Sequence, residues 1–168
     1  MKKILLAALA AISFAACSPK PAEAPAKKGN GYTDIETEHV NTVKKLNEAS
    51  VAYDSAATRA FYSGTQDTIH NNLENLTLDQ NLAMLADLKK RGITATIDAY
   101  PAIWETVNDS ANAKGVTNFV IAYMTMTLKK GDKTAKVLFN QICAFNKEGK
   151  IVEEWDVYDS KPFFDIAP

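Results

Sequence analysis

Hydrophobic and polar positions change their period once along the chain, near residue 93. Before that point apolar side chains recur every three to four residues, as in the series Val43, Leu46 and Tyr53, which is typical of amphipathic helices. After it, apolar and polar residues alternate, which is typical of half-buried strands. We therefore expect an α+β domain whose helices precede its sheet.

The first expected helix begins at Asp34 or Thr37, because either side chain can cap its first turn. Its apolar pattern continues to Phe61 with a bend near Asp54, and the pair at residues 63–64, Ser-Gly, ends it. We therefore expect one bent helix in this part of the chain.

The second expected helix starts with a capping box. The Thr77 hydroxyl can accept a hydrogen bond from the backbone N–H of Gln80, while the Gln80 side chain can reach back to the backbone of Thr77. Leucines then line one face, and Gly92 can adopt the left-handed conformation that ends a helix. A helix between Thr77 and Gly92 follows from this pattern.

Four strands are expected in the second half, over residues 93–107, 116–129, 133–145 and 150–158. Pro101 interrupts the first of them, because proline cannot donate to a strand ladder. A hairpin turn with the sequence Asn-Lys-Glu-Gly joins the last two. A long, twisted sheet of this kind can curl over helices and form a cone with one open end. We expect Phe163 and Phe164, in the tail, to dock on the domain.

The N-terminal segment is typical of a bacterial export signal. Two lysines precede an apolar run from Ile4 to Ala16, which is too short to span a bilayer as a helix. The run ends in Phe-Ala-Ala-Cys, which resembles a lipobox, although Leu is commoner than Phe at its first position. The resemblance implies that residues 1–16 are a lipoprotein signal peptide and that Cys17 becomes the acylated first residue. An ordinary signal peptide that contains a cysteine is the alternative.

Residues 17–33 are rich in proline, alanine and lysine, and we expect them to form a flexible tether before a single domain over residues 34–168. Ser18, rather than an aspartate, follows Cys17. By resemblance to known sorting patterns, this predicts a lipid anchor in the outer membrane, with the domain in the periplasm.

Composition excludes several function classes. Among 168 residues there are 19 Lys plus Arg and 20 Asp plus Glu, a net charge of −1, whereas nucleic-acid binders carry a basic surplus. Two His and two Cys leave little material for a metal site, and no phosphate loop or nucleophile elbow occurs. We therefore expect no nucleic acid, metal or cofactor.

Cys143 lies in an apolar run, which favours a buried thiol over a reactive one.

Three stretches carry a family resemblance: the closing hairpin Phe145–Asp159, the strand segment Ala102–Val107 and the stretch Asp67–Asn71 between the helices. In their order and pattern they resemble the nuclear transport factor 2-like superfamily and, within it, the SnoaL-like group. The resemblance implies a cone-shaped half-barrel, with N-terminal helices packed on a curved, mainly antiparallel four-stranded sheet. It also implies a pocket between sheet and helices and a homodimer through the outer face of the sheet. The superfamily contains isomerases, epoxide hydrolases, cyclases, dehydratases and non-catalytic members, so the fold does not determine the reaction.

Enzymes of this superfamily typically place a carboxylate inside an apolar cone, and here the last strand carries the candidates. Alternation puts Trp155, Val157 and Asp159 on one face and Asp156 on the other. The face with Ile, Trp and Val is the better core face. Asp159 is therefore the candidate general base near the pocket mouth, and Asp156 is expected to face outward. A bulge would reverse this assignment, and a solvated carboxylate is the alternative for both.

The two histidines are weaker candidates. His70 lies on a polar connector, Asp-Thr-Ile-His-Asn-Asn, where a catalytic base, a donor that orients a ligand and a residue at the surface or pocket rim are all open; the last is favoured. His39 lies among charged residues of the first expected helix, and we expect it to be solvated.

Aromatic residues supply a second set of candidates. Tyr53, Trp104, Tyr123 and Trp155 lie on elements expected to line the cone and combine bulk with a polar atom, which suits a mostly apolar ligand pocket. Phe139 is assigned to core packing.

Two functions follow from these patterns. The favoured one is a periplasm-facing lipoprotein whose cone binds a small, mostly apolar or aromatic molecule without catalysis. The alternative is a cofactor-independent isomerase, hydratase or lyase that uses Asp159 or His70 as general base. A dimer whose cone is filled by its own side chains remains a third option.

Overall fold

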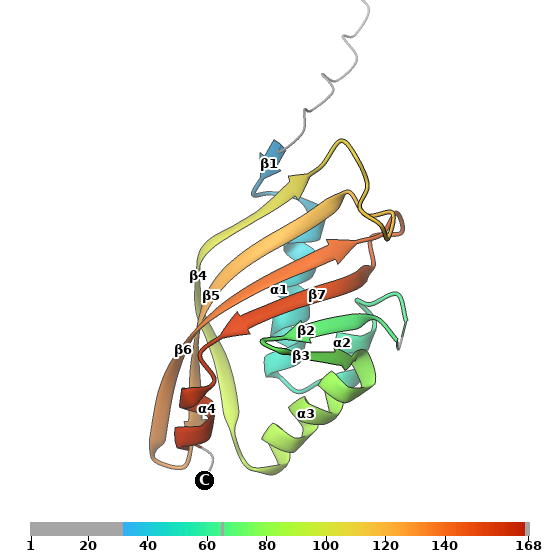
Figure 1. Cartoon of the computed structure of the whole chain (residues 1–168). Helices are drawn as coiled ribbons and strands as arrows, with labels where there is room; N and C mark the ends of the chain where they lie inside the picture. The colour runs from blue at the N-terminus through green and yellow to red at the C-terminus, as the bar shows by residue number, and fades with distance from the viewer. Residues whose placement is uncertain (1–31, 65, 167–168) are drawn as a thin grey trace, which may run out of the picture.

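The structure, a computed structural model, describes residues 32–64 and 66–166 (Figure 1). Within them one curved sheet wraps around the helices, which lie against its inner face (Figure 1). The sheet has seven strands in the order β1-β4-β5-β6-β7-β2-β3. The expected α+β architecture, with helices packed on a curved and mainly antiparallel sheet, is confirmed, but there are seven strands where four were expected.

The four long strands are those that the alternation predicted. They are β4 (Thr94–Val107), β5 (Asn118–Lys130), β6 (Lys133–Phe145) and β7 (Ile151–Tyr158), and they form an antiparallel meander. The pairing of β4 with β5 shifts register between Ile97 and Ala102. This irregularity lies next to Pro101, as its missing N–H predicted.

Three short strands extend this meander. They are β1 (Tyr32–Asp34), β2 (Thr68–Asn71) and β3 (Glu74–Thr77). β2 runs parallel to β7, and His70 is the register partner of Trp155. The prediction of a polar connector around His70 is therefore wrong. Strands of three or four residues are too short to show an alternation, and β2 becomes a strand because β7 offers it an edge.

The first expected helix is divided in two. α1 (Glu38–Val51) is capped by Thr37, whose side chain accepts from the backbone N–H of Val40. α2 (Ser55–Arg59) is capped by Asp54. Between them Tyr53 has a φ of 56°, which breaks the helical path at the place where a bend was expected.

α3 (Leu78–Lys90) has the predicted capping box, with both the Thr77 and the Gln80 hydrogen bonds present.

A last helix, α4 (Lys161–Ile166), packs its buried Ile166 with Ile93, Leu128 and Val137. The tail phenylalanines differ. Phe163 is half-buried and contacts the ring of Tyr158, as expected, whereas Phe164 is 75% exposed, so its expected docking is wrong.

The main core joins α1 to the inner face of the sheet. Val43 and Leu46 of α1 pack with Val120 of β5 and Cys143 of β6. Cys143 is fully buried, so the prediction of a buried thiol is confirmed. Burial raises the pKa of this thiol well above its ordinary value, and the charges of Glu154 and Asp156 add to the effect.

The expected signal peptide, the acylation site at Cys17 and nearly all of the tether lie outside the described residues. Within the described residues, no helix combines the length and the apolar character needed to cross a membrane.

Candidate ligand-binding site

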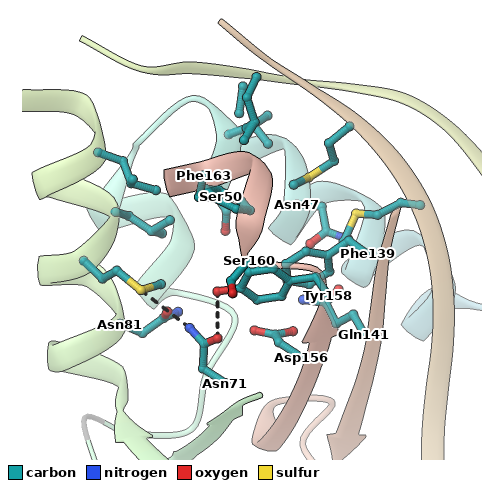
Figure 2. A pocket seen from close by; sticks show the side chains of 18 of the residues that line it. Asn47, Ser50, Asn71, Asn81, Phe139, Gln141, Asp156, Tyr158, Ser160 and Phe163 are labelled. Carbon is teal, nitrogen blue, oxygen red and sulfur yellow. Dashed lines mark hydrogen bonds between the residues drawn. The ribbon is translucent and has the colours of Figure 1, made fainter. Parts of the chain in front are cut away.

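A cavity of about 300 Å³ lies between the inner face of the sheet and helices α1, α3 and α4 (Figure 2). Apolar side chains make up much of its wall, among them Met84, Leu85, Leu88, Met124, Met126, Leu128, Phe139 and Phe163. Polar side chains also line the cavity, and we call the following set the polar floor: Asn47, Tyr62, Asn71, Gln141, Glu154, Asp156 and Tyr158. A cavity that is apolar with a few convergent polar groups is typical of small-molecule sites.

The polar floor exists because β7 contains a bulge. Ile151 pairs with Phe145, and Glu153 pairs with the preceding residue, Ala144, so Val152 is an extra residue on β7. An extra residue shifts the alternation by one position. After the bulge, the side chains that face the cavity are those that uninterrupted alternation would have placed on the outer face of the sheet.

The bulge moves both candidate aspartates. Asp156 is 5% exposed and lines the cavity, so the prediction that it faces outward is wrong. Val157, which was assigned to the core face, is 60% exposed. Asp159 is exposed and is not among the residues that line the cavity. It accepts a hydrogen bond from the backbone N–H of Lys161 at 2.9 Å, at the start of α4.

Glu154 is the second carboxyl group of the polar floor. It is 3% exposed and accepts a hydrogen bond from the Tyr62 hydroxyl. Its other oxygen accepts from the Gln141 amide nitrogen at 2.9 Å. Both of its oxygens are therefore held by donors from other parts of the chain, which stabilises an ionised carboxylate.

The surroundings of Asp156 favour the protonated form of its carboxyl group. Burial raises the pKa of the Asp156 carboxyl well above its ordinary value, and the negative charge of Glu154 raises it further. The Gln141 amide opposes this shift. Asp156 therefore keeps its proton at a higher pH than an ordinary carboxyl group, so the floor holds a carboxyl group that can act as a hydrogen-bond donor or acid.

Two polar atoms of the floor are buried and have no hydrogen-bond partner among the described residues. They are Oδ1 of Asp156 and Oε1 of Gln141, and both side chains lie around the same space (Figure 2). By contrast, the Tyr158 hydroxyl donates to Oδ1 of Asn71 at 2.8 Å. Buried polar groups normally have partners, so the two open atoms are available to a ligand.

Aromatic rings border the floor. Phe139 and Tyr158 stack with ring centres 4.7 Å apart, and the Phe163 ring is tilted against Tyr158 with ring centres 5.3 Å apart. Phe139 lines the cavity, so its assignment to core packing is wrong. Tyr53 also lines the cavity, as expected, and its hydroxyl donates to the backbone carbonyl of Ile93 at 2.8 Å.

The other three aromatic candidates are not among the residues that line this cavity. Trp104 and Tyr123 stack on each other with ring centres 6.1 Å apart. Met124 points into the cavity, so its neighbour on β5, Tyr123, points to the outer face of the sheet. Trp155 lies between the inward-facing Glu154 and Asp156 and therefore points to the outer face. Trp104 instead borders a shallow hollow beside β1.

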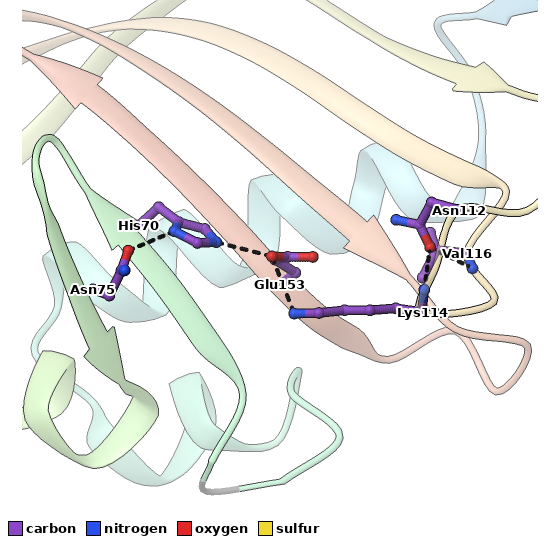
Figure 3. A network of polar contacts seen from close by, with 6 residues as sticks. All are labelled: His70, Asn75, Asn112, Lys114, Val116 and Glu153. Atoms are coloured by element: carbon purple, nitrogen blue, oxygen red, sulfur yellow. Dashed lines mark hydrogen bonds and ion pairs between the residues drawn. The ribbon is translucent and has the colours of Figure 1, made fainter.

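His70 takes part in a separate polar network on the outer side of the sheet (Figure 3). Its ring stacks on Trp155, with Nδ1 2.6 Å from Oδ1 of Asn75 and Nε2 2.8 Å from Oε1 of Glu153. Lys114 pairs with the same carboxylate at 3.0 Å. Burial raises the pKa of Glu153, but the hydrogen bonds from His70 and Lys114 outweigh this and lower it.

His39 was expected to be solvated, and this is wrong. Its Nδ1 lies 2.7 Å from Oε1 of Glu105, and its ring stacks on Phe145 at 4.3 Å. The partners come from strands far along the sequence, which the local charge pattern does not reveal. Neither histidine lines the cavity, and in the part of the chain that the structure describes no group of three His, Cys, Asp or Glu is placed to hold a metal ion.

No protein-family model matches the sequence, and no curated protein matches it significantly. Solved structures match it in fold. A protein from Shewanella denitrificans, described as a SnoaL-like polyketide cyclase, is 11% identical with a TM-score of 0.57, covering 78% of this chain and 97% of that chain. IdmH from Streptomyces antibioticus, described as a polyketide cyclase, is 13% identical with a TM-score of 0.56, covering 77% and 97%. The domain has the SnoaL-like fold.

A third match, to a protein of Pseudomonas putida described as a polyketide cyclase, is 14% identical with a TM-score of 0.56, over 79% of this chain and 100% of that chain. At these identities the likeness concerns the fold, so the chemistry of this SnoaL-like domain has to be argued from its own cavity.

Proposed function

We propose that this SnoaL-like domain binds a small, mostly apolar ligand in its cavity and is held at the bacterial outer membrane, facing the periplasm, by acyl chains on Cys17. The observation that carries the binding proposal is the cavity of about 300 Å³, with apolar walls and two open polar atoms on the polar floor. Apolar walls provide affinity and the polar atoms orient the ligand.

Binding can be tested with N-phenylnaphthylamine, an apolar dye whose fluorescence rises when it leaves water. The full chain carrying Cys17→Ser avoids acyl groups that would also bind the dye. Met124→Trp fills the cavity from β5, where Met124 is 2% exposed, and it should reduce dye affinity about tenfold or more. The matched control is Tyr123→Trp, one residue away and 38% exposed. Equal dye affinity in both variants would exclude the cavity as the binding site.

The lipid anchor rests on the lipobox-like sequence at Cys17. Cells fed labelled palmitate should incorporate it into the wild-type protein, while Cys17→Ala should lose both the label and membrane association. Ser18→Ala is the control and should keep both. Membrane association that survives in Cys17→Ala would contradict the anchor.

A second candidate function is acid–base catalysis at Asp156. It is favoured by a buried carboxyl group with a raised pKa inside an apolar cavity, an environment that suits proton transfer at a carbon next to a carbonyl group. β-Tetralone in heavy water offers a test, because its acidic C–H groups exchange when a base removes their protons. Wild-type protein should speed this exchange and Asp156→Asn should abolish the increase. Equal exchange in the two proteins would leave the cavity as a binding site alone.

A further inference from the structure

The charges around the polar floor are unbalanced. Two carboxyl groups, Glu154 and Asp156, lie there with 3% and 5% exposure. Among the described residues that line the cavity, Arg91 is the one basic side chain, and it pairs with Asp87 at 3.5 Å near the end of α3. A buried negative charge is costly without a positive partner, and the floor contains none of its own.

The open atoms of the floor are mainly acceptors. Gln141 donates its amide nitrogen to Glu154 at 2.9 Å, which fixes the orientation of the amide and leaves Oε1 without a partner. Oδ1 of Asp156 is likewise without a partner among the described residues, and both side chains lie at the cavity in Figure 2. A ligand group with several N–H donors would satisfy both oxygens at once.

The walls beside these oxygens are aromatic. Tyr158 and Phe139 stack at 4.7 Å next to Asp156 on the floor (Figure 2). Aromatic faces attract cations through their quadrupole, most strongly where water is excluded. Charge, open acceptors and ring faces therefore favour the same kind of ligand group.

We propose, on the basis of the ligand-binding function above, that the cavity takes an apolar amine whose ammonium group lies between Asp156 and Gln141. Its three N–H donors reach Oδ1 of Asp156 and Oε1 of Gln141, while its apolar body lies against the methionine, leucine and phenylalanine walls. Glu154 adds negative potential behind this position. A carboxylate ligand of the same shape is repelled by the same charge.

Binding is coupled to release of a proton. Burial and the Glu154 charge raise the pKa of Asp156, so in the empty cavity its carboxyl keeps its proton to a higher pH than an ordinary carboxyl group does. When the ammonium ion binds, the Asp156 carboxyl loses its proton to solvent and a carboxylate–ammonium pair forms. The positive charge of the ligand then replaces that of the released proton, and the net charge of the site does not change. The titratable groups around Asp156 are Glu154 and Tyr158 on β7, Cys143 on β6 and Tyr62 after α2. Burial raises the pKa of the two tyrosines and of the cysteine, so these three keep their own protons near neutral pH.

Calorimetry on the full chain with Cys17→Ser tests the proposal. Three ligands of one shape are compared near pH 7: naphthylmethylamine, naphthylmethanol and naphthoate. We expect the amine to bind at least about tenfold more tightly than the alcohol, and the naphthoate more weakly than the alcohol. Titrations in buffers with different heats of ionisation should show proton release with the amine and none with the alcohol.

Asp156→Asn should bring the ratio of amine to alcohol affinity near one and abolish the proton release. Asp159→Asn makes the same chemical change outside the cavity and should leave both unchanged. Alcohol binding as tight as amine binding, or amine binding without proton release, would overturn the amine assignment while leaving the cavity a ligand site. Failure of all three ligands together with the dye would instead overturn the proposed function.

Discussion

The Tyr62 hydroxyl donates a hydrogen bond to the Glu154 carboxylate across 92 positions of sequence. Tyr62 is 6% exposed and Glu154 3%, so the bond lies inside the protein. It connects the segment after α2 to β7 and holds in place the charge that governs Asp156. The framework of the site is therefore built by residues that are far apart in the sequence and adjacent in the fold.

Removing this hydroxyl should destabilise the protein. Tyr62→Phe leaves a buried carboxylate oxygen without its donor, which typically costs about 1–3 kcal/mol of unfolding free energy. Urea unfolding of the Cys17→Ser chain measures it. Tyr123→Phe is the control, because it removes the hydroxyl of a tyrosine that is 38% exposed and should cost much less. Equal losses in the two variants would show that the Tyr62 bond contributes nothing specific.

Asp156→Asn should stabilise the protein at neutral pH. The folded pKa of Asp156 lies above its unfolded value of about 3.9, so the folded state binds more protons between the two. The contribution of Asp156 to the free energy of unfolding is fully present below about pH 4 and is lost as the pH rises through the folded pKa. The variant should gain about 1–3 kcal/mol over wild type near pH 7 and nothing near pH 3. Urea midpoints that differ by the same amount at every pH would contradict the shift.

Glu105 should have the opposite pH dependence. Burial raises its pKa, but hydrogen bonds from Thr37, Asn118 and His39 outweigh this and lower it. Stability from this carboxylate is present above its unfolded pKa of about 4.3 and is lost as the pH falls through the folded value. Glu105→Gln should therefore cost about 1–3 kcal/mol near pH 7 and little in strong acid. Glu148→Gln, on an exposed turn, is the control and should leave the unfolding curves unchanged at both pH values.

Local signals predicted much of the fold. The capping box at Thr77 and the break near Asp54 depend on neighbours a few residues away, so the sequence contains all that is needed to find them. The hydrogen bond between His39 and Glu105 spans 66 positions, and β2 exists only beside β7. Such features follow from tertiary contacts, which periodicity does not report.

The candidate site was harder to predict, because it depends on one inserted residue. Val152 at the bulge shifts every later side chain of β7, and the carboxyl group in the cavity becomes Asp156 instead of Asp159. With the bulge, Trp155 points outward and two acidic residues point inward. Choosing the core face by its number of apolar residues rejects this arrangement. Buried carboxyl groups violate the usual core pattern, and such violations are expected at functional sites.

The Cys143 thiol should be inert in the folded protein. It is fully buried, and its pKa is raised by burial first and then by the charges of Glu154 and Asp156. Because the thiolate is the reactive form, both its access to solvent and its ionisation are suppressed. Iodoacetamide near pH 8 should modify the folded Cys17→Ser chain at least about 100-fold more slowly than the chain in concentrated urea. Mass spectrometry of the alkylated peptide measures this, and Leu138→Cys on the exposed outer face is the reference for an accessible thiol. Rapid alkylation of Cys143 under native conditions would mean that β6 opens readily and that the cavity floor is not a fixed structure.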